Sequence, residues 1–179
     1  MDARALPREL GLVTRAQAQA DGLSDRAIAW RIRSGRWQRL HDGVYATRPG
    51  PLGWLTRASG VLLACGTGAA LADRSAAYVH KLLDEPGPLI WVVVPQARRV
   101  VQPIGARVRR AKAFAAPGPQ WPPRTTVEAT LIDLASDASA DDIAAWLARS
   151  LQRRITTAPR LLRSSAAEAD TRSGRSFRR

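Results

Sequence analysis

The sequence predicts an α+β protein in which a small N-terminal helical unit is followed by a small α/β domain with a short sheet flanked by helices. Residues 3–46 alternate short helical stretches with glycines and end in two short strands joined by Asp42-Gly43. Residues 47–53, TRPGPLG, carry the prolines and glycines typical of a domain boundary. Beyond them, helical periodicity is interrupted by the strand-like run PLIWVVVP.

The N-terminal unit has clear signals for where each helix begins and ends. Ser, Thr and Asp favour helix starts because their side chains accept hydrogen bonds from free N–H groups, and Gly favours helix ends. These signals predict helices at 3–10, at 15–21 after Thr14, and at 25–34 after Ser24. The strands RWQRLH and VYAT follow, with Asp42-Gly43 as a type I′ turn. This order of elements is that of a winged helix-turn-helix, which we assign to residues 1–48.

The remainder predicts an α/β domain over residues 52–168 and a disordered basic tail over 169–179. Leu52, Leu55, Ala58, Leu62 and Cys65 recur at helical spacing and predict an amphipathic helix. The other expected elements are, in order, a helix at 75–83, the strand PLIWVVVP, the strand GARVRRAK, and helices at 126–136 and 141–152.

Charge indicates the class of partner. The chain carries a net charge of +13 with a pI of about 11.6, which favours nucleic acid first and acidic membrane surfaces second. Arginine supplies 26 of the 28 basic residues, a skew that is typical of codon bias, but bias does not explain the shortage of acids. Residues 1–10 lack the apolar core of a signal peptide, so we expect a cytoplasmic protein without a membrane partner.

The predicted third helix carries the candidate DNA-binding face. Arg26, Ala29, Trp30 and Arg33 share one stripe at i, i+3, i+4 and i+7, while Ile28 and Ile32 point elsewhere, toward the second helix. A helix fits the major groove of B-DNA, where arginine can donate two parallel hydrogen bonds to guanine. Small Ala29 allows close approach. For Trp30 we expect one of two positions: against a thymine methyl group or a sugar of the DNA, or packed under the hairpin.

The hairpin adds three candidate phosphate contacts: Arg36, Arg39 and His41. Trp37 and Tyr45 are better explained as core residues that anchor a two-stranded wing. The competing interpretation of the third helix is a solvated basic face without a partner, which is common in arginine-rich proteins. Agreement among the caps, the turn and the basic hairpin favours DNA binding.

Residues 11–46, GLVTRAQAQADGLSDRAIAWRIRSGRWQRLHDGVYA, resemble the N-terminal winged helix of AbiEi-type antitoxins of type IV toxin–antitoxin systems. The motifs that carry the resemblance are Gly-Leu-x-Thr, Gly-Leu-Ser, Ser-Gly-Arg-Trp and Gly-Val-Tyr-Ala. The similarity continues more loosely through LADRSAA, WVVVP and TTVEATLIDLA. The resemblance implies an autorepressor that binds the DNA of its own promoter region and an antitoxin that counteracts a nucleotidyltransferase toxin indirectly. A homodimer on DNA is compatible with it.

Some relatives of this type continue into a domain similar to very-short-patch-repair endonucleases, and the sequence ends where that domain would begin. Such nucleases use a Glu-x-Lys or Asp-x-Lys element, and neither Lys81 nor Lys112 has an acid two positions before it. We therefore expect no nuclease domain. PGPQWPPRTT also departs from the strand that such relatives have before the long helix.

No group of residues predicts catalysis, a metal site or a cofactor. Cys65 lies on the apolar stripe of its helix and fits a small buried hydrophobe, and with only two histidines a zinc site is not expected. ACGTGAAL lacks the lysine of a phosphate-binding loop. Two other hypotheses stay open: a protein-interaction module with the winged helix as scaffold, and a remnant of the repair-type endonuclease.

Overall fold

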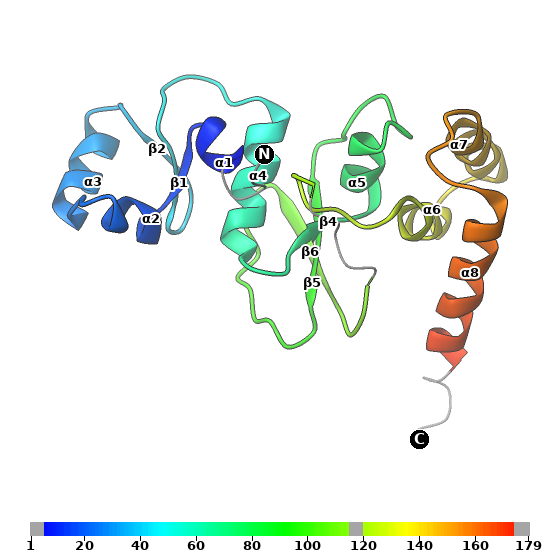
Figure 1. The fold of residues 1–179 in the computed structure, drawn as a ribbon. Helices are drawn as coiled ribbons and strands as arrows, with labels where there is room; N and C mark the ends of the chain where they lie inside the picture. Colours follow the sequence, from blue (N-terminus) through cyan, green and yellow to red (C-terminus); the bar gives the residue numbers. More distant parts are fainter. Residues whose placement is uncertain (1–5, 115–119, 174–179) are drawn as a thin grey trace.

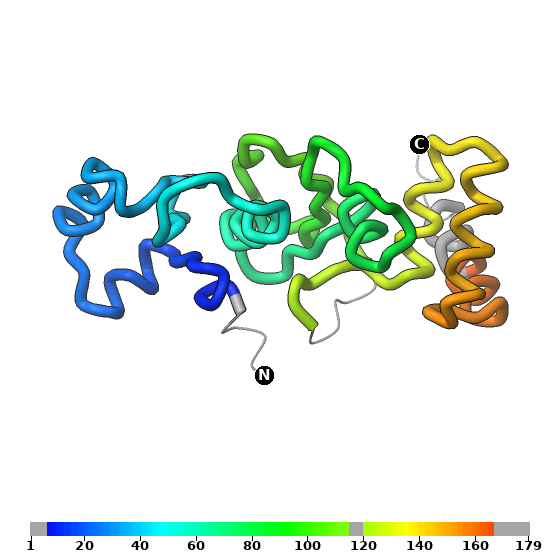
Figure 2. Tube along the Cα trace, turned by 90° about the horizontal axis from the view of Figure 1, so that it is seen from above, coloured from blue at the N-terminus to red at the C-terminus, as the bar shows by residue number. Residues whose placement is uncertain are grey.

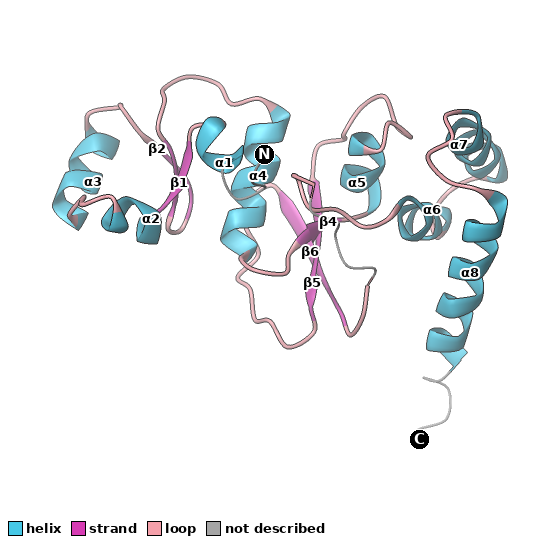
Figure 3. Cartoon of the chain, in the orientation of Figure 1, coloured by secondary structure: helices cyan, strands magenta, loops and turns pink. Residues whose placement is uncertain are grey.

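The computed structural model describes residues 6–114 and 120–173. From one end of the elongated molecule to the other, the chain forms the N-terminal helical unit, a central helix and sheet, and a group of helices (Figure 1). The view from above shows the same succession (Figure 2). Helices and two small three-stranded sheets alternate along the described chain (Figure 3), which confirms the predicted α+β class.

The N-terminal unit is a winged helix-turn-helix. Its antiparallel sheet has the strand order β1-β3-β2. Its elements are α1 (Leu6–Glu9), β1 (Leu12–Thr14), α2 (Arg15–Ala20), α3 (Asp25–Arg33), β2 (Gln38–His41) and β3 (Val44–Ala46). The sequence did not predict β1, because three residues between two helices are too short to show alternation and only pairing with β3 makes them a strand.

Both faces of this sheet are covered. Val13 and Tyr45 are cross-strand partners that pack with residues of α2 and α3. Leu12, Val44 and Ala46 are also buried, and alternation along a strand places their side chains on the opposite face, where α4 (Trp54–Cys65) lies. The three-residue strand β3 is therefore buried at every position.

The turn of the hairpin differs from the prediction. A type I′ turn needs positive φ at both central residues, but only Gly43 has it, at 66°. The type I′ prediction is therefore wrong. The pairing also shifts register between Arg39, which faces Tyr45, and His41, which faces Val44. Dihedral angles and a bulge of this kind depend on packing, so a turn dipeptide alone could not specify them.

The second part contains a sheet with the order β4-β5-β6, in which β4 runs antiparallel and β6 parallel to the central strand. The elements that build it are β4 (Ala70–Leu71), α5 (Asp73–Val79), β5 (Ile90–Pro95) and β6 (Ala106–Ala111). The two predicted strands are confirmed. The two-residue β4 was not predicted, because it is defined by its pairing with β5.

Helix α4 lies between the two sheets, with contacts to β1, β2 and β3 on one side and to β4 and β5 on the other. The helix itself is confirmed, but the prediction that only one face of it is buried is wrong. Leu55 is 41% exposed, and Thr56, Ser59 and Gly60 are buried beside the predicted apolar positions. A helix covered by two sheets is buried on most of its circumference, so small polar residues lie inside as well.

A group of helices forms the far end of the described chain: α6 (Val127–Ala135), α7 (Ala140–Gln152) and α8 (Ala158–Ser173). Helix α8 was not predicted. It includes residues 169–173, which the sequence analysis placed in a disordered tail, and residues 174–179 lie outside the described part. Buried Glu128 attaches this helix to α6: its carboxylate lies 3.0 Å from Arg160 Nε of α8 and accepts one hydrogen bond from the Thr156 hydroxyl just before the helix.

Candidate nucleic-acid interface

The predicted stripe on α3 faces outward. Arg26 and Arg33 are exposed, Trp30 is 47% exposed and Ala29 is half-buried. Ile28, on the opposite side of the helix, is only 3% exposed. The structure thus separates the charged stripe from the buried residue as the helical spacing requires.

The inward face of α3 holds the helix against the rest of the unit. Ile28 packs in one core with Val13, Ala18 and Tyr45. Ile32 and Trp37 are half-buried against the same core, as the sequence predicted. This packing fixes the rotation of α3 about its axis and so determines which residues face solvent.

One cap and one ion pair position the N-terminus of α3. Ser24 Oγ accepts a hydrogen bond from the Ala27 amide at 3.2 Å, which confirms the predicted cap. Asp25 accepts hydrogen bonds from Arg15 Nε at 2.8 Å and from Gln19 Nε2 at 3.0 Å, both in α2. The hydrogen bond from Arg15 lowers the pKa of Asp25 below its usual value. Asp25 therefore links the two helices of the helix-turn-helix, a role that the sequence analysis missed.

Aromatic rings hold two further arginines. The Arg36 guanidinium lies over the ring of Trp30, 4.7 Å from its centroid. Arg31 lies 5.5 Å from the ring centroid of Trp37. Arg36 was predicted as a wing residue for phosphates, but the structure places it beside the end of α3, where it forms one composite surface with Trp30. Alternation and spacing gave no signal for this pair, because residue 36 lies in neither a helix nor a strand.

The hairpin separates its two predicted contact residues. Arg39 is exposed and pairs with Tyr45, whereas His41 is half-buried and pairs with Val44. Their partners Tyr45 and Val44 are neighbours in β3, and neighbouring strand residues point to opposite faces of a sheet. The register shift therefore turns His41 away from the face that carries Arg39. His41 lies instead against α4, where it lines two cavities, and burial lowers its pKa. In a regular strand, residues 39 and 41 would lie on the same face, and for this reason both were predicted to contact phosphate.

Positive charge at this surface is not neutralised within the described part of the chain. Arg26, Arg33 and Arg39 have no ion pair with any described acid. Two nearby acids are paired with other arginines: Asp25 with Arg15, and Asp21 with Arg8 at 3.2 Å. The positive charges of Arg26, Arg33 and Arg39 are therefore available to bind an external anion.

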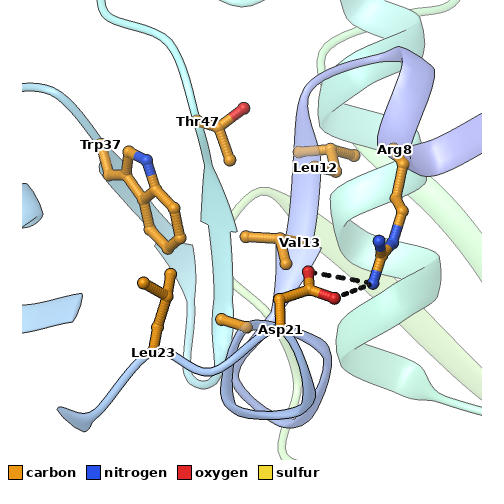
Figure 4. A pocket seen from close by; sticks show the side chains of 8 residues that line it. Arg8, Leu12, Val13, Asp21, Leu23, Trp37 and Thr47 are labelled. Atoms are coloured by element: carbon orange, nitrogen blue, oxygen red, sulfur yellow. Dashed lines mark hydrogen bonds and ion pairs between the residues drawn. The ribbon is translucent and has the colours of Figure 1, made fainter. Parts of the chain in front are cut away.

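A small hollow behind the helix-turn-helix is separate from this surface (Figure 4). Arg8 and Asp21 form an ion pair across its edge, and core residues such as Val13 and Trp37 line it. None of the stripe residues of α3 lines it. We therefore do not assign it to the candidate interface.

The residues considered for catalysis are structural in their contacts. Cys65 is buried, and burial raises the pKa of its thiol to about 11. One ring nitrogen of His80 lies 2.8 Å from the carbonyl oxygen of Thr125, and burial lowers the His80 pKa. Within residues 6–114 and 120–173, no three His, Cys, Asp or Glu side chains are arranged to hold a metal ion. No helix in the same ranges is long and apolar enough to cross a membrane.

The fold and this surface define a winged helix-turn-helix protein of the kind found among transcriptional regulators. Residues 3–48 match the family described as a transcriptional regulator, AbiEi antitoxin, which confirms the resemblance for this segment. A solved structure, the RV2827C protein from Mycobacterium tuberculosis, is similar in fold, with a TM-score of 0.52 at 20% sequence identity. That similarity covers 82% of this chain and 69% of the other. Curated proteins give no match.

Proposed function

We propose that this protein is a sequence-specific DNA-binding regulator that represses its own operon and acts as the antitoxin of a type IV toxin–antitoxin system. The observation that carries the proposal is the exposed, unpaired arginine pair on α3, in a segment that matches a regulator family. A helix in the major groove can place these guanidinium groups on guanine edges. We assign no catalytic step and no cofactor to this activity.

The spacing of the stripe suggests how much sequence one unit contacts. Arg26 and Arg33 are seven residues apart on α3, which corresponds to about 10 Å along the helix axis. Base pairs rise about 3.4 Å each, so the two side chains span roughly three base pairs. Half-buried Ala29 leaves room for the groove wall between them, and the Trp30–Arg36 pair lies beside it.

The exposed hairpin residue has a different role in this proposal. Arg39 contacts phosphate, which adds affinity without sequence preference. His41 is left out of the proposed interface, because it is half-buried against α4. The proposed contact set is therefore Arg26, Ala29, Trp30, Arg33, Arg36 and Arg39.

A footprint of the full chain on the DNA upstream of its own gene tests the regulator proposal. We expect one protected site, or two half-sites about 10 base pairs apart if two copies bind as a dimer. The double variant Arg26→Gln/Arg33→Gln should lose protection, while Arg163→Gln on α8, an exposed arginine far from the winged helix, should retain it. Protection by the double variant equal to that of the wild type would refute the assignment of α3.

The antitoxin half of the proposal rests on the family match and predicts separable activities. Co-expression with a nucleotidyltransferase encoded in the same operon should restore growth. If neutralisation is indirect and does not use the DNA-binding face, the Arg26→Gln/Arg33→Gln variant should still restore growth after it has lost repression. Failure of the wild-type chain to restore growth would remove the antitoxin assignment and leave the regulator assignment standing.

A second candidate function is a protein-interaction module, favoured by the large exposed area of Trp30. Exposed aromatic residues are common binding anchors in protein interfaces. Trp30→Ala distinguishes the two: a protein-binding role predicts loss of a co-purifying partner with DNA affinity unchanged. A DNA-binding role predicts weaker binding to the upstream site.

A further inference from the structure

A cavity of about 330 Å³ lies where the hairpin meets the second part of the molecule. Apolar and aromatic side chains from separate segments form most of its wall: Leu40 from β2, Leu52 from the linker, Trp54 and Val61 from α4, and Ile104 from the loop before β6. A neighbouring cavity of about 390 Å³ shares Leu40, His41 and Ile104 with it. Ligand sites in proteins commonly have this size and this mostly apolar lining.

The cavity lies beside the contact between the hairpin and Gly60 of α4. A Cβ atom on Gly60 would lie 2.8 Å from Leu40 Cδ2, so the Leu40 side chain packs directly on the helix backbone at this glycine. Around this point the chain is more open: Ile104 is 90% exposed at the rim. An exposed isoleucine next to an apolar cavity leaves apolar surface in water that an occupant would cover.

The few polar groups of the wall favour an anion. Arg57 is exposed, forms no ion pair with any described acid, and is the only charged side chain in the lining apart from His41, which burial keeps neutral at pH 7. Trp54 Nε1 is buried and has no hydrogen-bond partner within the described residues. Helix α4 also begins here, and its N-cap Gly53 supplies no side-chain hydrogen bond to the first turn. Free amide groups at a helix start add positive potential.

We propose that this cavity binds a small amphipathic anion, with its apolar body between Leu52, Val61 and Ile104 and its acidic group at Arg57. The occupant would contact the hairpin and α4 together, and would therefore bridge the winged helix and the second part of the molecule. The proposal does not depend on DNA binding, because no stripe residue of α3 lines the cavity.

Fluorescence titration of the full chain with 8-anilino-1-naphthalenesulfonate, an apolar dye that carries one sulfonate, tests the site. The matched neutral dye N-phenyl-1-naphthylamine has the same rings without the sulfonate. We expect one saturable site that binds the anionic dye about tenfold more tightly than the neutral one. Arg57→Gln should remove most of that difference, and Ile104→Asp should weaken the anionic dye by about tenfold or more, because it places a negative charge at the rim.

Two control variants separate a local effect from general dye binding. Arg163→Gln and Leu162→Asp change an exposed arginine and a 70% exposed leucine on α8, away from the cavity, and both should bind the dyes like the wild type. Near-ultraviolet circular dichroism checks that each variant is folded. The proposal is overturned by non-saturable dye binding, by equal affinity for the two dyes, or by cavity variants that behave like the controls.

Discussion

At the scale of single residues, the described arginines differ in what holds them. Arg15 is bound to Asp25, Arg31 and Arg36 lie over tryptophan rings, and Arg26 and Arg33 have neither kind of partner within the described chain. A guanidinium that is bound to a carboxylate has less to gain from a nucleic acid, whereas one that lies over an aromatic ring keeps its charge. The net charge of the chain therefore overstates the DNA-binding surface, and partner geometry identifies the residues that are free to act.

Replacing arginines of the two classes should have different effects on DNA binding. Arg33→Gln removes a base contact in our proposal, so affinity for the upstream site should fall by about 1 to 3 kcal/mol while affinity for unrelated DNA changes little. Arg39→Gln removes a phosphate contact and should weaken binding to both DNAs alike. Gel-shift titrations of the two variants on the two DNAs give the comparison. If both variants lost the same amount of preference for the upstream site over unrelated DNA, the division into base and phosphate contacts would be contradicted.

At the scale of elements, short contacts between neighbouring segments set the geometry of the molecule. Helix α3 contacts α2 through Asp25, the hairpin contacts α4 through Leu40 and Gly60, and α8 contacts α6 through the Arg160–Glu128 ion pair. The sequence does not predict any of these three pairings, and it did not predict α8 itself.

The Asp25 contact predicts a pH-dependent stability. The folded-state pKa of Asp25 is lowered by the hydrogen bond from Arg15, so its contribution is present above its ordinary value of about 4 and is lost as pH falls through the lowered pKa. Asp25→Asn removes this titration. As the pH is lowered from 5, the melting temperature of the wild type should therefore fall more steeply than that of the variant. Parallel melting curves across this range would show that the ion pair contributes nothing.

The Gly60 contact predicts a steric coupling between the hairpin and α4. A glycine inside a helix is unfavourable by about 0.5 to 1 kcal/mol relative to alanine, so its presence here reflects the close approach of Leu40. Gly60→Val should destabilise the protein by about 1 to 3 kcal/mol. Leu40→Ala in the same chain should recover part of that loss, measured as a coupling energy in denaturant unfolding. Additive effects of the two changes would contradict direct contact.

The Glu128 contact predicts how α8 is held. Burial acts to raise the pKa of Glu128, but the hydrogen bond from Thr156 and the charge of Arg160 outweigh it, and the pKa is lowered. Thr156→Val leaves one buried carboxylate oxygen without its hydroxyl donor and should cost about 1 to 3 kcal/mol of unfolding free energy. Thr67→Val, at an exposed position in the turn after α4, is the control and should cost less than about 0.5 kcal/mol. Urea unfolding followed by circular dichroism measures both.

At the scale of the whole molecule, the winged helix lies at one end and the α6–α8 group at the other (Figure 1). Basic residues occur along both parts: residues 1–48 carry a net charge of +4 and residues 49–125 a net charge of +7. The solved structure of similar fold aligns over 82% of this chain, which includes more than the winged helix. The similarity in fold to that structure therefore extends beyond residues 3–48, the segment that matches the antitoxin family.

Salt dependence distinguishes a winged helix that acts alone from a larger electrostatic footprint. For about 4 to 6 phosphate contacts per unit, log affinity should fall with log salt at a slope of about −4 to −5. Arg39→Gln should reduce the magnitude of the slope by about 1. A markedly steeper wild-type slope, measured by fluorescence anisotropy, would show that basic residues of the second part also contact DNA.

The sequence by itself determined the limits of α2 and α3 to within one residue, the outward arginine stripe on α3 and the two longer strands of the second sheet. These features follow from capping residues, helical spacing and β-branched density, which act within a few residues. Only the tertiary structure decided the strands β1 and β4, the turn at Gly43, the orientation of His41 and the burial of α4 on two sides. Each of these depends on a partner distant in the chain, such as Tyr45 for Val13 or Leu40 for Gly60, and local spacing carries no information about that partner.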